Sequence, residues 1–200
     1  MARRSPLRRE RKAEAPAPAP TEEDLLALAR RQFLAGERIS PEQLGAELGI
    51  PRATVYRWVG NAEQLAGEVI ARIVEDTHRR TLREARGRGA ERVLDTLVRG
   101  MRYIVASKPY QTFLARDPQK ALRTVASKEG PAQGRSIALI EALLEDEVAK
   151  GNLELPVDAH TMAFALVRIV ESFVYADMIS GEKPDLAKAE QILGLMLRAE

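Results

Sequence analysis

The sequence predicts an all-α protein, with a three-helix N-terminal unit that contains a helix-turn-helix and a C-terminal helical bundle. Aromatic residues make up only 4% of the 200 residues, whereas Ala, Leu, Arg and Glu, which favour helices over sheets, are abundant. Apolar residues recur at helical spacing, and no convincing alternation of apolar and polar residues predicts a strand. We therefore expect nine or ten helices and no sheet.

The first 20 residues form a basic, proline-rich segment. They carry six basic and two acidic side chains, a net charge of +4, and Pro16, Pro18 and Pro20 disfavour a helix. Residues 1–20 are therefore expected to be a disordered basic arm. The arm is either a solvated tail or a contact to DNA. In the second case, deleting residues 1–12 would flatten the salt dependence of DNA binding.

Three short helices are expected next. Thr21, followed by three acidic residues, starts the first helix, and Gly36 ends it. Two more are expected at Pro41–Leu48 and at about Arg52–Trp58, joined by the turn Gly49-Ile50-Pro51. A tight turn with glycine between two short helices is the layout of a helix-turn-helix, because glycine readily adopts a positive φ.

The remaining helices are expected to form the bundle, with Gly and Pro residues between them. They are expected from Ala62 to Ala85, at about residues 90–106, after Pro109, from Pro118 to about Ser127, and at residues 132–150, 158–179 and 184–199. This layout divides the chain into the arm (1–20), a helix-turn-helix domain (21–66) and a helical domain (67–200).

The third helix carries side chains that suit the DNA major groove. Arg forms paired hydrogen bonds with guanine, Thr contacts bases or phosphates, and Tyr donates to phosphates. Here these residues are Arg52, Thr54, Tyr56 and Arg57. From spacing alone, the alternative is a helical hairpin of a bundle whose exposed face is polar.

Residues 44–65, LGAELGIPRATVYRWVGNAEQL, resemble the DNA-binding region of TetR-type transcriptional regulators. The resemblance implies a DNA-binding domain of three helices, a connecting fourth helix and a helical C-terminal domain. It also matches Tyr56 to a tyrosine that contacts backbone phosphate. Ala62 departs from the family, which usually has a phosphate-gripping Lys there. The resulting DNA-binding candidates are Ser40, Gln43, Arg52, Ala53, Thr54, Tyr56, Arg57, Trp58 and Asn61.

The stretch Arg168–Asp177, RIVESFVYAD, is similar to the QsdR-like subgroup of that family. The resemblance implies a ligand-responsive repressor that binds a palindromic DNA operator as a homodimer. The two subunits are expected to associate through their last two helices. A dimer also presents two recognition helices to successive major grooves, about 34–36 Å apart. The effector implied is a small lipophilic molecule.

An effector pocket in this half has to be built from helix-borne side chains, mostly apolar with a few polar ones. Arg168 and Glu171 interrupt an otherwise apolar helix, and a charge in such a place needs a partner or a polar ligand. The alternatives are a mutual salt bridge for this pair and ordinary core packing for the aromatic residues. The ligand-binding candidates are Tyr103, Tyr110, Phe113, Phe164, Arg168, Glu171 and Tyr175.

Several other classes of protein are disfavoured. The chain has no cysteine, and its two histidines, His78 and His160, lie in no metal-binding motif, so neither a metal nor a cofactor is expected. No stretch is long and apolar enough to cross a membrane, and no signal peptide is evident, so a cytoplasmic location is expected. An enzyme is not expected, since no nucleophile–base pair is evident. A helical-bundle enzyme and a structural adaptor without DNA contact remain the alternatives.

Overall fold

The computed structural model describes residues 19–127 and 130–198, and within them the chain forms eleven helices and no strand. The predicted all-α class is confirmed. Residues 1–18 of the predicted basic arm lie outside the described residues. The helices are α1 (Glu22–Leu34), α2 (Pro41–Leu48), α3 (Arg52–Val59), α4 (Ala62–Glu84), α5 (Ala90–Ala106), α6 (Lys108–Arg116), α7 (Pro118–Ala126), α8 (Pro131–Ala149), α9 (Ala159–Val174), α10 (Ala176–Ile179) and α11 (Leu186–Met196).

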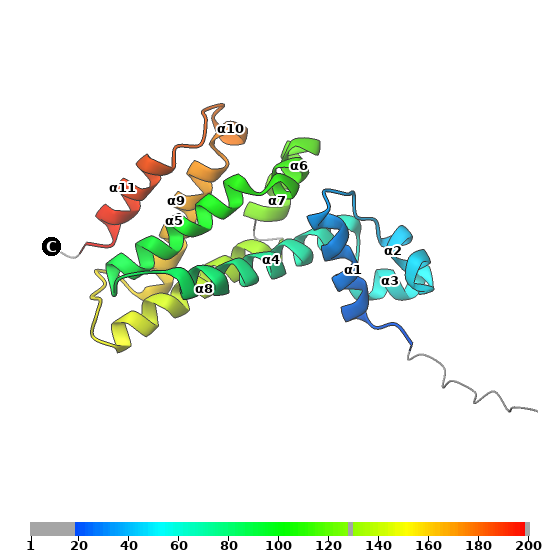
Figure 1. Cartoon of the computed structure of the whole chain (residues 1–200), viewed down its shortest axis with the longest axis horizontal. Helices are drawn as coiled ribbons and strands as arrows, with labels where there is room; N and C mark the ends of the chain where they lie inside the picture. Colours follow the sequence, from blue (N-terminus) through cyan, green and yellow to red (C-terminus); the bar gives the residue numbers. More distant parts are fainter. Residues whose placement is uncertain (1–18, 128–129, 199–200) are drawn as a thin grey trace, which may run out of the picture.

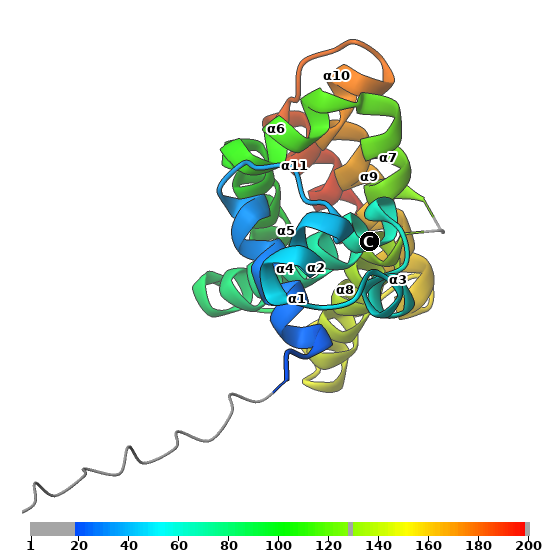
Figure 2. The same cartoon turned by 90° about the vertical axis from the view of Figure 1, so that its right-hand side faces the viewer.

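The molecule is elongated, with α1–α3 grouped at one end and the bundle at the other (Figure 1). We call α1–α3 the three-helix unit and α5–α11 the bundle. The long helix α4 leaves the three-helix unit and runs into the bundle, where it packs against α8 and α5. Viewed from the end that carries the three-helix unit, α1, α2 and α3 lie in front of α4 (Figure 2). Helix α4 is therefore the main physical connection between the two parts.

Local capping explains where the N-terminal helices begin. Thr21 forms a capping box with Asp24, and Ser40 accepts a hydrogen bond from the backbone N–H of Gln43. Gly49 ends α2 with φ 69°, a backbone conformation that favours glycine. The chain can therefore reverse between α2 and α3 as the sequence predicts.

The helix count differs from the prediction at one place. A single helix was expected over residues 158–179, but the chain leaves helical geometry at Tyr175, with φ −107° and ψ 22°, and forms α9 and α10 instead. The Tyr175 ring is buried, and its hydroxyl meets that of Tyr110 from α6. This contact is tertiary, so the local apolar pattern did not reveal the break.

The buried apolar side chains form one continuous cluster that joins the three-helix unit to the bundle. It runs from Leu25 and Phe33 in α1 through Leu65 and Val69 in α4 to Leu166 in α9. The shared core means that a change in bundle packing can reach the helix-turn-helix.

None of the described helices is long and apolar enough to cross a membrane.

Candidate DNA-binding face and effector cavity

Helices α2 and α3 approach each other closely because α2 carries a glycine at the crossing. A Cβ atom added at Gly45 would lie 2.7 Å from Val55 Cγ2 and 3.2 Å from the carbonyl oxygen of Ile50. The Val55 side chain is buried, with 1% of its surface exposed. One face of α3 is therefore fixed against the core, and its other faces are left for contacts with a partner.

The outer face of α3 carries the predicted DNA-binding side chains. Arg52, Ala53 and Arg57 are exposed, while Thr54 and Tyr56 are half-buried. Helix α3 therefore presents both arginine side chains to solvent. Arginine and tyrosine on an exposed helix are the donors that guanine edges and phosphates accept.

Glu42, in the first turn of α2, contacts two of these side chains. The Tyr56 hydroxyl donates to the Glu42 carboxylate, and the Arg52 guanidinium lies 3.6 Å from the same carboxylate. The same guanidinium lies 5.3 Å from the centre of the Tyr56 ring. The hydrogen bond from Tyr56 is the main reason that the pKa of Glu42 falls to about 2. Glu42 is therefore ionised at neutral pH and would compete with DNA phosphate for both side chains.

Three other candidates have structural partners. The Ser40 side chain caps α2, and the Asn61 side chain caps α4 by accepting two backbone N–H groups of its first turn, each at 2.9 Å. Trp58 is half-buried and packs against the hydrophobic core. Gln43 is exposed. For Ser40, Asn61 and Trp58, a role in local structure thus accounts for the residue type.

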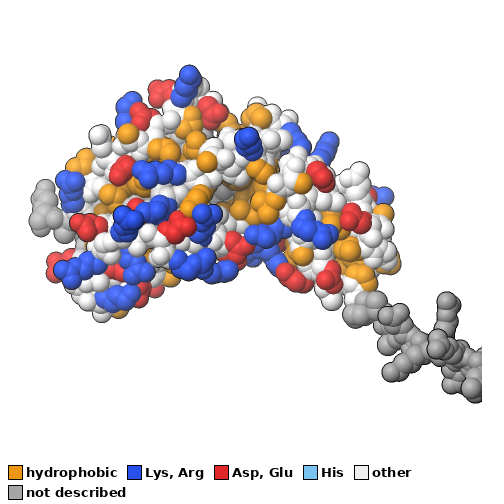
Figure 3. Space-filling view, in the orientation of Figure 1, with side chains coloured by type: hydrophobic (Ala, Val, Ile, Leu, Met, Phe, Trp, Pro, Cys, Tyr) orange, Lys and Arg blue, Asp and Glu red, His pale blue; other side chains and the backbone are white. Residues whose placement is uncertain are grey.

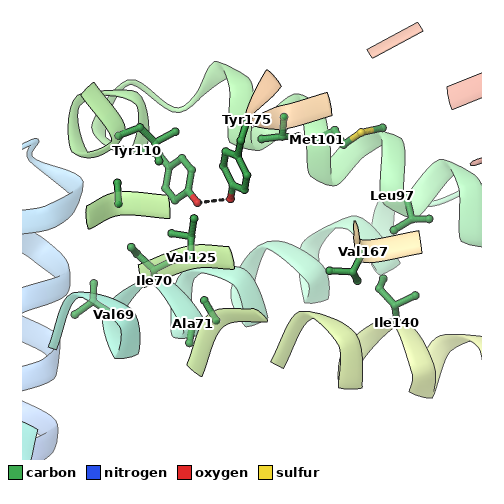
Figure 4. Packing of buried hydrophobic residues seen from close by; sticks show 14 of the residues in the cluster. Val69, Ile70, Ala71, Leu97, Met101, Tyr110, Val125, Ile140, Val167 and Tyr175 are labelled. Atoms are coloured by element: carbon green, nitrogen blue, oxygen red, sulfur yellow. Dashed lines mark hydrogen bonds between the residues drawn. The ribbon is translucent and has the colours of Figure 1, made fainter. Parts of the chain in front are cut away.

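A cavity of about 420 Å³ lies between α1 and the bundle. Its wall is mainly apolar and includes Phe33 and Leu34 from α1. It also includes Ile70 from α4, Met101 from α5 and Val167 from α9, which are labelled in Figure 4. This volume lies in the range of small-molecule sites. The three-helix unit and the bundle therefore both form part of the cavity.

A second hollow, of about 720 Å³, is lined mostly by charged side chains of α1, α4 and α8. Its charges pair with each other. Arg72 lies 2.6 Å from Glu23, and Arg135 lies 3.1 Å from Glu68. Since these ion pairs occupy its polar groups, the apolar cavity is the better candidate for a lipophilic molecule.

The wall of the apolar cavity also carries polar side chains, and Tyr110, Glu171 and Tyr175 are buried ones among them. The hydroxyl oxygens of Tyr110 and Tyr175 lie 2.7 Å apart (Figure 4), and burial raises the pKa of both side chains. Burial also raises the pKa of Glu171, although Gln133 donates to its carboxylate at 3.1 Å and Arg168 at 2.7 Å. These two neutral hydroxyl groups and one carboxyl group are therefore among the polar groups that a bound molecule would meet.

Comparison with known proteins agrees with this architecture. Residues 88–198 match the family model described as "Tetracyclin repressor-like, C-terminal domain". The chain belongs to the TetR family. It is 30% identical to the transcriptional repressor QsdR of R. erythropolis, over 90% of this chain and 96% of that one, with a TM-score of 0.83. The predicted family and its QsdR-like subgroup are therefore confirmed.

More distant TetR-family structures share the fold. AlkX from Dietzia sp. strain DQ12-45-1b is 17% identical, over 90% of this chain and 96% of that one, with a TM-score of 0.60. No curated protein matches the chain. Because TetR-family regulators are not enzymes, the enzyme alternative is set aside.

The cavity of this TetR-family chain includes four of the seven predicted ligand-binding residues. They are Tyr103, Tyr110, Glu171 and Tyr175. The other three, Phe113, Phe164 and Arg168, do not line this cavity.

A physical reason explains why each of these three side chains is absent from the cavity wall. Phe113 packs between two other rings, with its centroid 5.6 Å from that of Phe33 and 6.3 Å from that of Tyr110. Phe164 lies about two turns before Glu171 and is 49% exposed on α9. Arg168 is exposed and forms the salt bridge with Glu171 that was the alternative to a pocket role.

Residues of α4 that the sequence analysis left out also line the cavity of this TetR-family chain. His78 and Thr81 belong to this wall, and burial lowers the pKa of His78. They continue a helical series that begins at Ile70 and Val74. Helical spacing from Ile70 therefore indicates both positions from the sequence.

Proposed function

We propose that this TetR-family chain is a ligand-responsive repressor that binds a palindromic operator as a homodimer and is released by a small lipophilic effector. Residues 21–66 would bind DNA, and residues 67–200 would bind the effector and the second subunit. Its place of action would be the cytoplasm, with the DNA. The observation that carries the proposal is the apolar cavity whose wall includes Phe33 and Leu34 of α1.

The shared wall supports a mechanism of release. An effector that fills the cavity contacts α1 and the bundle at the same time, so it favours the arrangement of α1 in which those contacts are best. The effector weakens DNA binding only to the extent that its affinity for that arrangement exceeds its affinity for the DNA-bound arrangement. Helix α4, which joins the bundle to the three-helix unit, transmits the difference to α3.

The apolar faces of α9 and α11 support the proposed dimer. Phe164 of α9 and Leu195 of α11 are 49% and 63% exposed, and Ile192 of α11 is 40% exposed. Leu195→Glu would place a charge in the interface, so sedimentation should show monomers and operator affinity should fall sharply. Val148→Glu alters an apolar residue on α8 that is 42% exposed, and this variant should remain dimeric.

DNA binding is tested in a mobility-shift assay with the DNA that lies upstream of the gene encoding this chain. Arg52→Ala together with Arg57→Ala should weaken operator binding at least about tenfold, because Arg pairs with guanine contribute about 1–3 kcal/mol each. Arg83→Ala with Arg102→Ala, on exposed parts of α4 and α5, is the matched control. Equal binding by the two double variants would contradict the proposed recognition helix.

Effector binding is tested by thermal-shift screening of lipophilic acids, lactones and drugs. A compound that binds only the folded chain raises the melting temperature, and it should then release the operator in the mobility-shift assay. Val167→Trp would fill part of the cavity and should remove both responses. A compound that releases DNA equally well from this variant would place the effector site elsewhere.

A further inference from the structure

The three-helix unit and the start of α4 have too few positive charges to neutralise DNA. Residues 21–66 carry five basic and seven acidic side chains, a net charge of −2. Duplex DNA carries one negative charge per about 1.7 Å of its axis. Figure 3 shows charges of both signs over one face of the molecule. Cations for the DNA backbone therefore have to come from specific neighbouring elements.

Helix α7 of the bundle brings two cations to the first turn of α4. The Lys120 Nζ atom lies 3.9 Å from the Glu63 carboxylate, and the Arg123 Nε atom lies 3.7 Å from it. Both side chains remain open to solvent, with 47% and 62% of their surfaces exposed. Because they are three residues apart, they share one face of α7.

This place adjoins the recognition helix. Helix α3 ends at Val59 and α4 begins at Ala62, so only Gly60 and Asn61 separate them. Asn61 in this turn and Ala62 at the start of α4 are exposed, and Figure 2 shows α7 on the same side of the view as α3. Ala62 carries no charge and Glu63 is negative, so neither neutralises a phosphate at this edge.

The packing of α7 against α4 fixes the two cations in position. A Cβ atom added at Gly67 would lie 2.9 Å from Pro131 Cδ and 3.7 Å from Thr124 Cγ2, so α4 and the α7–α8 junction touch closely one turn beyond Glu63. Val125, also on α7, lines the effector cavity. The same short helix therefore touches both the cavity and the edge of the DNA-binding face.

We propose that Lys120 and Arg123 form a second phosphate-binding element, carried by the bundle, which contacts the operator backbone beside the first turn of α4. This inference rests on the proposed DNA-binding function. On binding, the two cations exchange Glu63 for phosphate oxygens. A ligand that displaces α7 then removes phosphate contacts directly, in addition to changing the spacing of the recognition helices.

The test measures the salt dependence of DNA binding with the full chain. In Lys120→Gln/Arg123→Gln, the slope of log K against log salt should become shallower by about 1.8 per subunit, since each phosphate contact contributes about 0.9. Affinity for operator and for random duplex should fall by the same factor, because phosphate contacts carry no sequence information.

A matched control and a variant of opposite sign complete the test. Arg102→Gln/Lys150→Gln removes two cations of similar exposure, 63% and 46%, that pair with Glu190 and Asp146 of the bundle. Its slope should equal that of the unmodified chain. Glu63→Gln should tighten binding, because it removes the competing carboxylate.

The outcomes separate this inference from the proposed function. If the unmodified chain binds its operator and the α7 variant keeps the full slope, the second phosphate-binding element is overturned. An equal loss in the control variant, or no tightening by Glu63→Gln, overturns it as well. If the unmodified chain binds no duplex at all, the proposed function itself fails.

Discussion

The hydroxyl pair in the cavity gives a prediction that tests its energetics. Tyr110 and Tyr175 are 8% and 5% exposed, and their hydroxyl oxygens lie 2.7 Å apart. Tyr175→Phe would leave the Tyr110 hydroxyl without its tyrosine partner in a mainly apolar wall. We expect the free energy of unfolding to fall by about 1–3 kcal/mol, the cost of a buried unsatisfied polar group. Tyr110→Phe should cost a similar amount.

The double variant decides between a paired and an independent role. Tyr110→Phe/Tyr175→Phe removes both polar groups with little change of shape. Its loss of unfolding free energy should therefore be smaller than the sum of the two single losses by about 1–2 kcal/mol. Urea denaturation followed by circular dichroism measures this, at one fixed protein concentration because a dimer's stability depends on concentration. Strictly additive losses would refute the reasoning, since the hydroxyl groups would then not satisfy each other.

Three further variants test the helix-turn-helix and the cavity. Gly45→Ala places a Cβ atom against Val55 and should destabilise the chain by about 1–3 kcal/mol, with part of the loss recovered by Val55→Ala in the same chain. Glu42→Gln removes the carboxylate that accepts from Tyr56, so DNA binding should tighten a few fold. Because the pKa of Glu42 is about 2, this gain should be the same from about pH 5 to pH 8. Burial lowers the pKa of His78, so the unfolded chain binds more protons below about pH 6.5, and stability should fall as the pH falls. His78→Phe should therefore lose less in melting temperature between pH 7 and pH 5 than the unmodified chain.

Each of these three predictions has an outcome that would contradict it. For Glu42, the control is Glu47→Gln, which removes an exposed carboxylate of α2 that accepts from Gln32 instead of Tyr56. An equal gain from both variants would mean that only net charge matters. A Gly45→Ala chain as stable as the original would show that α2 and α3 can separate without cost. If the melting temperature of His78→Phe falls as much between pH 7 and pH 5 as that of the unmodified chain, another group controls stability in that pH range.

The sequence could predict the features that depend on neighbouring residues. The caps at Thr21 and Ser40 and the turn at Gly49 are local, because each needs only a hydrogen bond or a backbone angle within a few residues. Helix α3 could be predicted for the same reason. Its buried residues Val55 and Val59 are four positions apart on one face, and the exposed Arg57, two positions from each, lies on the other side.

The apolar cavity depended on how separate helices pack. Phe164 and Arg168 are on the predicted helix, but no local pattern shows which face of α9 lines the cavity. Helical spacing indicates which side chains of α4 face inward, yet not that α1 closes the cavity with Phe33.

Sequence alone therefore determined the helical class, the helix-turn-helix and the TetR family, since capping, apolar spacing and a short motif are properties of contiguous residues. Tertiary structure decided the wall of the cavity, the hydroxyl pair of Tyr110 and Tyr175, and the approach of α7 to the first turn of α4. These contacts join residues tens of positions apart. Their energies depend on burial and distance in the folded chain, which a linear pattern does not contain.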